Sequence, residues 1–297
     1  MSKELETLNV IIAGHIDHGK TTLLYKLSRK WTDTHSEELK RGITIKLGYA
    51  DITISKDSEY NIDNKGKQER YISFIDAPGH EMLMATMLSG AAIVDAAILV
   101  VAANEGIKPQ TREHLMALQA KNIKDIIIVQ NKVDLVTKEK ALENYHNIKR
   151  EFKNTIAENA PVIPVSAQQN INIERIYEAL CEIQVPERNE EKVPIFFVAR
   201  SFDINKPGTK PKNLHGAVLG GTLKEGSINI GDIIEIKPGL AIKEANQIRY
   251  KTFKTKVASI FKGTSKMEKL TPGGSASIET ELDMALGKSD AFSGCIV

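Results

Sequence analysis

The segment AGHIDHGKTT, residues 13–22, contains residues that fit two different chemistries. Its two histidines and the aspartate between them are possible zinc ligands at short spacing. Its glycines, followed by Lys-Thr, also fit the pattern GxxxxGK[ST], which binds nucleotide phosphates at the start of a helix. In that pattern, backbone N–H groups surround the phosphates, the lysine reaches the β and γ oxygens, and the threonine binds Mg²⁺. The segment alone leaves both interpretations open.

A second motif, NKVD, follows the apolar run DIIIVQ and predicts a guanine site. Asp134 can accept hydrogen bonds from the ring N–H and the exocyclic amine of guanine, and adenine lacks this pair of donors. Two charge-assisted hydrogen bonds of about 1.5 to 3 kcal/mol each give a preference of roughly a hundredfold or more. Asn131 is expected at the other edge of the base, and the stem of Lys132 is expected to pack on its face. The motif therefore favours GTP over ATP and disfavours an ATP-dependent kinase.

The dipeptide Ser166-Ala167 ends the next apolar run, PVIPVSA. At that position a backbone N–H is expected to meet the guanine O6. A plain turn between strand and helix, with Ser166 as the helix cap, fits the same two residues. Only their place in the chain supports the nucleotide interpretation.

Two further segments predict a response to the γ-phosphate. In DAPGH, residues 76–80, Asp76 is expected to hold Mg²⁺ through water, the Gly79 N–H to sense the γ-phosphate, and His80 to orient the attacking water. In KRGITIK, Thr44 is expected to bind Mg²⁺ only when the γ-phosphate is present. As sequence alone, KRGITIK fits a basic edge strand equally well.

Together these motifs give three sets of predicted site residues. The catalytic set is His80, Lys20, Thr44 and Gly79. The nucleotide-binding set is Gly14, Asp17, His18, Gly19, Lys20, Thr21, Thr22, Asn131, Lys132, Asp134, Ser166 and Ala167. The Mg²⁺ set is Thr21, Thr44, Asp76 and Asp17. GTP or GDP and Mg²⁺ are the expected cofactors.

The elements that must position these residues alternate along residues 8–183. Apolar strands such as LNVIIAG and AAILVVAA are followed by amphipathic stretches such as PQTREHLMALQA and TKEKALENYHNIKREFKNTIAE, which predicts a mostly parallel sheet with helices on both faces. YADITI and ERYISFID have no helix between them and predict an antiparallel hairpin at the sheet edge. This is the α/β pattern of a P-loop GTPase domain.

The pattern changes after the charged, proline-flanked segment QVPERNEEKVP. Short strands separated by Gly and Pro turns follow, and they predict one small all-β barrel. The expected organisation is a GTP-binding domain over residues 1–186, a linker over 187–193 and the barrel over 194–297.

Composition sets further limits. Residues 1–191 hold 24 Lys and Arg against 28 Asp and Glu, and residues 192–297 hold 16 against 10, so the basic excess lies in the second part. Such an excess suits RNA contact but is also common in ordinary domains. The two cysteines, Cys181 and Cys295, form no CxxC pair and suggest no disulfide framework. No apolar run is long enough to span a membrane and no secretion signal is evident, so no membrane partner and a cytoplasmic location are expected.

These motifs, in this order and followed by a barrel, resemble the translational GTPases. The segments WTDTHSEELKRGITIK, APGHEMLMATMLSGA, NEGIKPQTREHLMAL and RSFDINKPGT resemble, within that group, the gamma-subunit family of archaeal and eukaryotic translation initiation factor 2. The resemblance runs from about residue 8 to the end of the chain.

The resemblance implies partners that spacing could not reveal. Members bind initiator methionyl-tRNA in their GTP form and deliver it to the small ribosomal subunit as a heterotrimer with alpha and beta subunits. The beta subunit is expected on the GTPase domain and the alpha subunit on the first barrel. Because no arginine finger is evident, hydrolysis by the chain alone is expected to be slow, and a GTPase-activating partner is expected.

Two departures from the family pattern matter. Many members carry cysteine pairs between the two hairpin strands, whereas residues 55–70 of this chain contain none, so no structural zinc is expected. The family has a further barrel after the first, and this sequence is expected to lack it. Two alternatives stay open: an elongation-type translational GTPase, including the selenocysteine-specific kind, and a scaffold for partner subunits with little or no hydrolysis.

Overall fold

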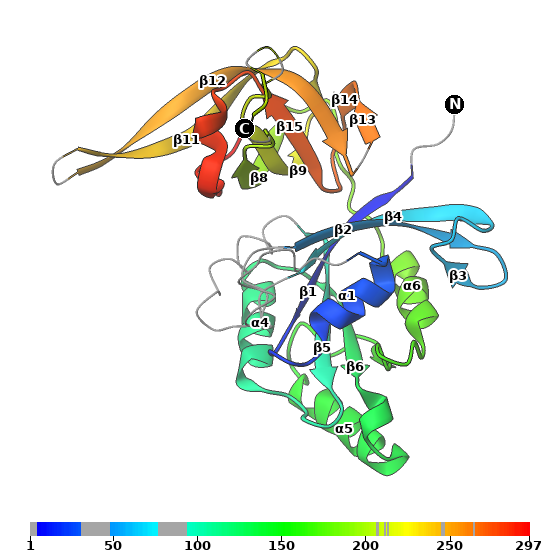
Figure 1. Ribbon diagram of the computed structural model, residues 1–297. Coiled ribbons are helices and arrows are strands. Elements are labelled where there is room, and N and C mark those ends of the chain that lie inside the picture. The colour runs from blue at the N-terminus through cyan, green and yellow to red at the C-terminus, as the bar shows by residue number, and fades with distance from the viewer. Residues whose placement is uncertain are drawn as a thin grey trace. The chain divides into compact units, whose positions relative to one another are not determined.

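A computed structural model describes residues 5–30, 48–76, 94–205, 208–210, 212, 214–244, 247–263 and 265–297. The chain divides into two compact units, Met1–Pro186 and Glu187–Val297. Figure 1 shows the elements of both units, and each unit is described here by itself.

The first unit is built on a seven-stranded sheet with the order β3-β2-β4-β1-β5-β6-β7. The strands are β1 (Thr7–Gly14), β2 (Gly48–Lys56), β3 (Tyr60–Asn61), β4 (Lys67–Asp76), β5 (Ala96–Ala102), β6 (Asp125–Asn131) and β7 (Val162–Pro164). From β4 to β7 all neighbours are parallel, whereas β2 pairs with β4 and β3 with β2 in the antiparallel sense. The predicted parallel sheet with an antiparallel edge is confirmed.

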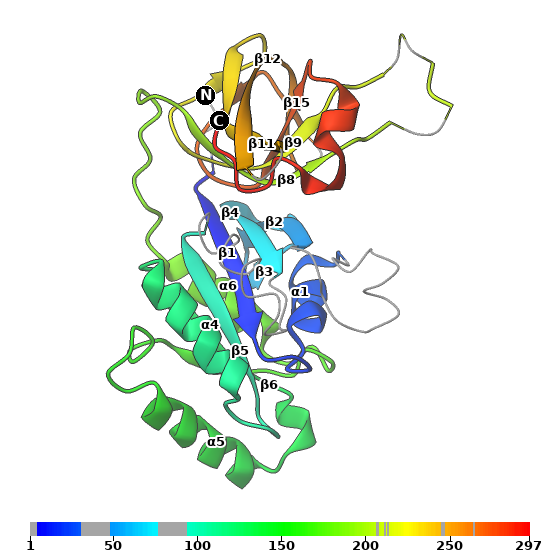
Figure 2. The ribbon, with the colours of Figure 1, turned by 90° about the vertical axis from the view of Figure 1, so that its left-hand side faces the viewer.

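Helices lie on both faces of this sheet (Figure 2). The helices are α1 (Lys20–Ser28), α4 (Pro109–Ala120), α5 (Lys138–Glu151) and α6 (Ile173–Glu182). Alternate residues of β1, Leu8, Val10 and Ile12, pack with leucines of α1 and apolar residues of α6 in one fully buried cluster. Helix α4 contacts β1 and β5, and α5 bonds to the Gln130 side chain of β6, on the other face. The strands are buried on both sides, which explains why their sequences are continuously apolar.

Helix α5 is shorter than predicted. The amphipathic stretch from 137 to 158 suggested one helix, but α5 ends at Glu151 and turns follow. Asn154 adopts a left-handed conformation, with φ of 62°, and its N–H donates to the Glu158 carboxylate. The Thr155 hydroxyl donates back to the Phe152 carbonyl. These local side-chain bonds compete with the helix, an effect that hydrophobic periodicity does not report.

The segment expected to lack zinc ligands is organised by an asparagine. The Asn61 side chain donates to the carbonyls of Glu59 and Lys65 and accepts from the N–H groups of Asp63 and Lys65. This set of hydrogen bonds fixes the turn between β2 and β4. Within the described ranges, no group of three or more His, Cys, Asp or Glu side chains is placed to hold a metal ion.

The second unit is an antiparallel barrel, as the pattern of short strands predicted. Its strands are β8 (Ile195–Phe202), β9 (Val218–Glu225), β10 (Ile228–Asn229), β11 (Ile233–Glu244), β12 (Gln247–Lys262), β13 (Ser265–Met267), β14 (Lys269–Leu270) and β15 (Ala276–Thr280). The main sheet has the order β11-β12-β15-β9-β8. Ile296 bridges both Phe197 of β8 and Lys237 of β11, which joins the two end strands and closes the sheet.

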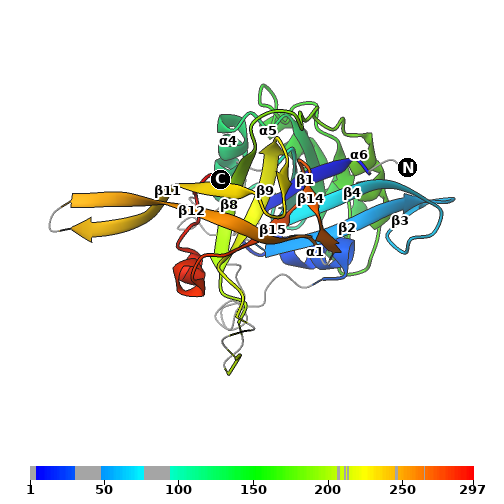
Figure 3. The same ribbon diagram turned by 90° about the horizontal axis from the view of Figure 1, so that it is seen from above.

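The hairpin of β11 and β12 is much longer than predicted. The sequence suggested strands at 231–239 and 254–261, but the ladder continues from Leu240–Lys251 to Glu244–Gln247. Figure 3 shows this two-stranded ribbon projecting from the barrel. Only the 257–262 end of β12 pairs with β13 or β15, so the distal part has no third strand among the described pairings.

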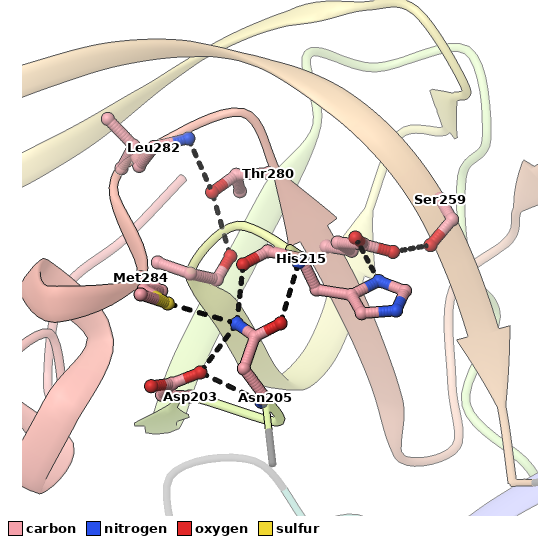
Figure 4. Close-up of polar contacts among 9 residues, drawn as sticks. Asp203, Asn205, His215, Ser259, Thr280, Leu282 and Met284 are labelled. Atoms are coloured by element: carbon pink, nitrogen blue, oxygen red, sulfur yellow. Dashed lines mark hydrogen bonds and ion pairs between the residues drawn. The ribbon is translucent and has the colours of Figure 1, made fainter. Parts of the chain in front are cut away.

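One polar side chain organises the barrel next to β8. Figure 4 shows the Asn205 amide at the centre of a network in which its Nδ2 donates to Asp203 Oδ1 at 2.7 Å and to the His215 carbonyl at 2.8 Å. The His215 N–H returns a bond to Asn205 Oδ1 at 2.8 Å. The His215 ring also contacts Glu279 Oε1 at 2.7 Å, and the Ser259 hydroxyl donates to the other oxygen of that carboxylate. The chain before and after residues 206–214 is thereby fixed to β12 and β15.

The segment expected to be a linker is bonded to the barrel. The Asn189 carbonyl accepts the Gly226 N–H, Glu190 pairs with Lys269, and Lys192 pairs with Glu225. In the described part of the chain, no helix is both long and apolar enough to cross a membrane.

Candidate functional site

The predicted nucleotide motifs that the structure describes all follow the carboxyl ends of parallel strands. Residues 15–19 follow β1, Asp76 ends β4, Asn131 ends β6, and Ser166 follows β7. In an open α/β sheet this edge is where ligands bind. Thr44, Gly79 and His80 lie outside the described residues.

Two glycines allow the loop after β1 to take its shape. Gly14 has φ of 136°, and a Cβ placed on it would lie 2.4 Å from the Val100 carbonyl oxygen. Gly19 has φ of 85°, and its Cβ would lie 2.5 Å from Asn131 Nδ2. Other residues rarely adopt either conformation, and a side chain would meet backbone at Gly14 and the Asn131 amide at Gly19. The two glycines of the phosphate-binding pattern are therefore required by the geometry of the loop itself.

Helix α1 begins directly at the end of this loop. Gly19 is its N-cap and supplies no side-chain cap, and Lys20, Thr21 and Thr22 form its first turn. The Lys20 ammonium donates to the His15 carbonyl at 2.9 Å, so the loop curls around it. A glycine-capped helix start with a lysine enclosed by the preceding loop is the arrangement that binds phosphate.

The two histidines of the loop shape it from within. His18 is fully buried, and its Nδ1 lies 3.2 Å from the Val100 carbonyl oxygen. Burial lowers the pKa of His18 to about 4, so the ring is neutral at pH 7. Its ring stands edge-on to that of His15 at 5.1 Å. Asp17, between them, has φ of 60° and is exposed at the tip of the loop.

Two side chains of helix α4 accept hydrogen bonds from the loop after β1. The sequence did not predict these contacts. The Gly14 N–H donates to His114 Nδ1 at 2.8 Å, and the Ile16 N–H donates to Gln110 Oε1 at 3.2 Å. Burial, with smaller effects from Lys20 and His15, lowers the pKa of His114 to about 3 and keeps the ring neutral. In the sequence, the sign of these contacts was that Gln110 and His114 lie four residues apart on the buried face of an amphipathic helix.

Two predicted Mg²⁺ ligands lie together. The Thr21 hydroxyl donates to Asp76 Oδ2 at 3.0 Å, although 55 residues separate them in the chain. Asp76 is fully buried at the end of β4. A hydroxyl and a carboxylate oxygen beside a phosphate loop are the oxygen donors that Mg²⁺ prefers.

Asn131 connects the phosphate loop to the guanine motifs. Its Nδ2 donates to the His18 carbonyl at 2.9 Å, and its Oδ1 accepts the Ala167 N–H at 3.1 Å. The sequence predicts that Asn131 and the N–H of the Ser166-Ala167 turn both face the guanine, and this stays a prediction. In the structure they bond to each other, which fixes the spacing between the phosphate loop and the guanine motifs.

The other residues predicted to contact guanine lie close to Asn131 in the chain or follow the next strand. Lys132 has φ of 62°, and Asp134 is exposed. Ser166 is buried, and its hydroxyl accepts the Gln169 N–H at 3.1 Å. Ser166 therefore stabilises the turn after β7, but it is not a helix cap, because α6 begins at Ile173 and its N-cap is Asn172.

The chain is similar in sequence and fold to known GTP-binding proteins. Residues 5–186 match the family described as the elongation factor Tu GTP binding domain. The translation initiation factor 2 gamma subunit of Methanosarcina mazei is 51% identical over 97% of this chain and 70% of its own length. That of Archaeoglobus fulgidus is 52% identical over 99% of this chain and 72% of its own length.

Solved structures of selenocysteine factors share the fold at lower identity. The Methanococcus maripaludis translation elongation factor SelB with the GTP analogue GppNHp has a TM-score of 0.75 and 27% identity, over 99% of this chain. A bacterial selenocysteine-specific elongation factor has a TM-score of 0.74 and 28% identity, over 95% of this chain. The chain spans 55% and 43%, about half, of the length of these two proteins.

Proposed function

The chain belongs to the family of translation initiation factor 2 gamma subunits, which are translational GTPases, and we propose that it is the nucleotide-dependent switch that carries initiator methionyl-tRNA to the small ribosomal subunit. The bridge made by Asn131 between the phosphate loop and the Ser166-Ala167 turn carries this proposal. It sets base-reading and phosphate-binding groups at a fixed distance on one sheet edge, as a guanine nucleotide requires. The identity of about half to initiation factors, against about a quarter to the selenocysteine factors, favours initiation over elongation.

The phosphate side of the site is assigned to the loop and the start of α1. Backbone N–H groups of residues 17–22 hold the phosphates, and Lys20 reaches the β and γ oxygens. Thr21 and Asp76 fit Mg²⁺, which neutralises phosphate charge when bound, and their 3.0 Å contact brings both oxygens to one point. Asp17 at the exposed tip is a further Mg²⁺ candidate. Thr44, Gly79 and His80 keep their predicted roles in sensing the γ-phosphate and orienting water.

The base side is assigned to Asp134, with Lys132 packing on the ring. Asp134→Asn replaces an acceptor by a group that presents an amine to the guanine donors, so GDP binding is expected to weaken about a hundredfold. Asp125→Asn is the matched control, because Asp125 is exposed at the start of β6, the strand that Asp134 follows. Isothermal titration with GDP measures both. Equal GDP affinity in Asp134→Asn and the unaltered chain would contradict the assignment.

The initiation role is tested with tRNA. Initiator methionyl-tRNA is titrated against the chain loaded with GDP or with a non-hydrolysable GTP analogue, and tighter binding is expected with the analogue. An elongator aminoacyl-tRNA serves as the specificity control. Equal affinity for both tRNAs supports an elongation-type factor instead. A chain that binds GTP but hydrolyses none, with or without an activating ribosome, supports the scaffold alternative.

We place the beta subunit in an apolar pocket of the first unit. The pocket, of about 540 Å³, lies between β6, β7 and the first half of α5 and is lined largely by apolar residues such as Val133, Ala141 and Leu142. Leu142 is 51% exposed, and a partly open apolar pocket is typical of a docking site. Leu142→Asp is expected to abolish co-purification of a beta subunit and to leave GDP affinity unchanged. Met116→Asp, on an apolar residue of α4 that is 69% exposed and lies outside the pocket, is the control.

We place the alpha subunit on the barrel ribbon formed by residues 240–244 and 247–251. An isolated two-stranded ribbon is marginally stable by itself, and this one carries Tyr250 and Ile242, which are 60% and 40% exposed. Tyr250→Ser is expected to weaken alpha-subunit binding at least tenfold by surface plasmon resonance. Unchanged binding would move the alpha subunit elsewhere on the barrel.

A further inference from the structure

Glu105 lies between the phosphate loop and the guanine motif, and none of the predicted nucleotide-binding residues includes it. It follows β5, the strand between β1 and β6, in a tight turn where the N–H groups of Glu105 and Gly106 both donate to the Ala102 carbonyl. The Ala103 N–H donates to the Asn131 carbonyl at 2.7 Å, which holds this turn against the end of β6. These backbone hydrogen bonds therefore fix the position of the Glu105 Cα.

The two oxygens of the Glu105 carboxylate face different parts of the site. Oε1 lies 3.6 Å from the Lys132 ammonium, in the guanine motif. Oε2 lies 4.0 Å from His18 Nε2, in the phosphate loop, and 3.8 Å from the Lys108 ammonium. The carboxylate is 30% exposed and Lys132 is 27% exposed, so the pair is partly shielded from water.

The His18 ring faces the Glu105 carboxylate, and its tautomer determines what that face of the ring can bind. A carbonyl only accepts hydrogen bonds, so the contact with Val100 requires the hydrogen of the neutral ring to be on Nδ1. Nε2 is then an acceptor, and in the described part of the structure this buried atom has no hydrogen-bond partner. The cation beside this pair of acceptors is the Lys108 ammonium, 3.8 Å from Oε2. The Lys132 ammonium of the guanine motif forms an ion pair with the other oxygen, Oε1, at 3.6 Å.

We propose that Glu105 is a positioning residue for the guanine nucleotide and acts by orienting Lys132. The stem of Lys132 packs on the base only if its four methylene groups are held along one direction, and a free lysine side chain loses about 2 kcal/mol of rotamer entropy when it is ordered. The ion pair with Glu105 orders the side chain before the nucleotide binds. This inference rests on the proposed nucleotide site.

The test compares Glu105→Gln with Glu151→Gln. Glu105→Gln removes the charge and keeps the shape, and Glu151→Gln removes a shorter and more exposed ion pair with Arg112 in the same unit, outside the nucleotide loops. Glu105→Gln is expected to weaken GDP binding about threefold to fivefold, the range of a partly exposed ion pair. The KM for GTP is expected to rise by the same factor with kcat unchanged, and Glu151→Gln is expected to change neither.

A double-mutant cycle with Lys132→Met separates positioning from general structural support. If Glu105 acts through Lys132, Glu105→Gln has no further effect on GDP affinity in the Lys132→Met chain. An equal loss in both backgrounds, or no loss in either, overturns the inference. If instead both Lys132→Met and Asp134→Asn leave GDP binding unchanged, the nucleotide site itself is assigned wrongly.

Discussion

His114 gives the first unit a measurable sensitivity to acid. In the folded chain its ring accepts the Gly14 N–H and burial lowers its pKa to about 3, from an ordinary value of 6.5. The unfolded chain takes up a proton near pH 6.5 while the folded ring stays neutral down to about pH 3. Acid therefore favours the unfolded state, and the stability that His114 contributes is lost as the pH falls from 6.5 towards 3.

The size of the effect follows from the pKa difference. Each pH unit between the two pKa values corresponds to about 1.4 kcal/mol. Between pH 6.5 and pH 5, the His114 ring is expected to cost the folded state about 2 kcal/mol. His18, whose pKa is also lowered by burial, adds a loss of the same sign.

His114→Asn isolates the contribution of this ring. An asparagine amide oxygen takes about the place of Nδ1 and accepts the Gly14 N–H, but it does not titrate. The assay is urea unfolding at pH 7, 6 and 5, followed by circular dichroism at 222 nm, since the described α-helices all belong to the first unit. His114→Asn is expected to lose about 2 kcal/mol less than the unaltered chain over this range.

The matched control is His146→Asn, because His146 is exposed on α5. It is expected to follow the pH dependence of the unaltered chain. His114→Ala separates the charge from the hydrogen bond, because it leaves the Gly14 N–H buried without its acceptor and is expected to cost at least about 1 to 3 kcal/mol at pH 7. The same pH slope in His114→Asn and the unaltered chain would refute the assignment of a neutral, buried His114.

Two further changes test the packing around the loop. Gly19→Ala forces a methyl group against the Asn131 amide at a φ of 85°, so a loss of GDP affinity of tenfold or more is expected by titration; Gly208→Ala, which meets no neighbour within 4 Å, controls for general glycine replacement. Tyr177→Phe removes a buried O–H that donates to the Leu27 carbonyl at 2.9 Å, so calorimetry is expected to show a loss of about 1 kcal/mol. An unchanged midpoint in that scan would mean that this bond adds nothing to the packing of α6 on α1.

Sequence reasoning succeeded where local pattern and fold agree. The apolar runs before Gly14, Asp76 and Asn131 could only be buried strands, so the chain order of motifs translated directly into one sheet edge. Their common position at the carboxyl ends then follows from the parallel pairing. The fold of the first unit was therefore predictable to within a few residues at most element ends.

What could not be predicted depends on contacts between distant segments. His114 and Gln110 support a loop about a hundred residues earlier in the chain, and nothing in their own helix indicates which backbone groups they meet. The long ribbon of β11 and β12 is held by its cross-strand ladder rather than by a regular alternation of apolar residues. Such features follow from tertiary pairing, which overrides local propensity.

Whether the histidines of AGHIDHGKTT are suited to bind zinc depends on where their lone pairs point. A zinc ligand must offer a lone pair at a point shared with two or three other ligands. His18 is fully buried, its Nδ1 hydrogen belongs to the Val100 carbonyl, and its Nε2 faces a carboxylate that also engages two lysines. Among the described residues, no group of three or more His, Cys, Asp or Glu side chains is placed to hold a metal ion with either ring. His18 instead holds the loop against β5 through the Val100 carbonyl, and we expect this shape to suit a nucleotide.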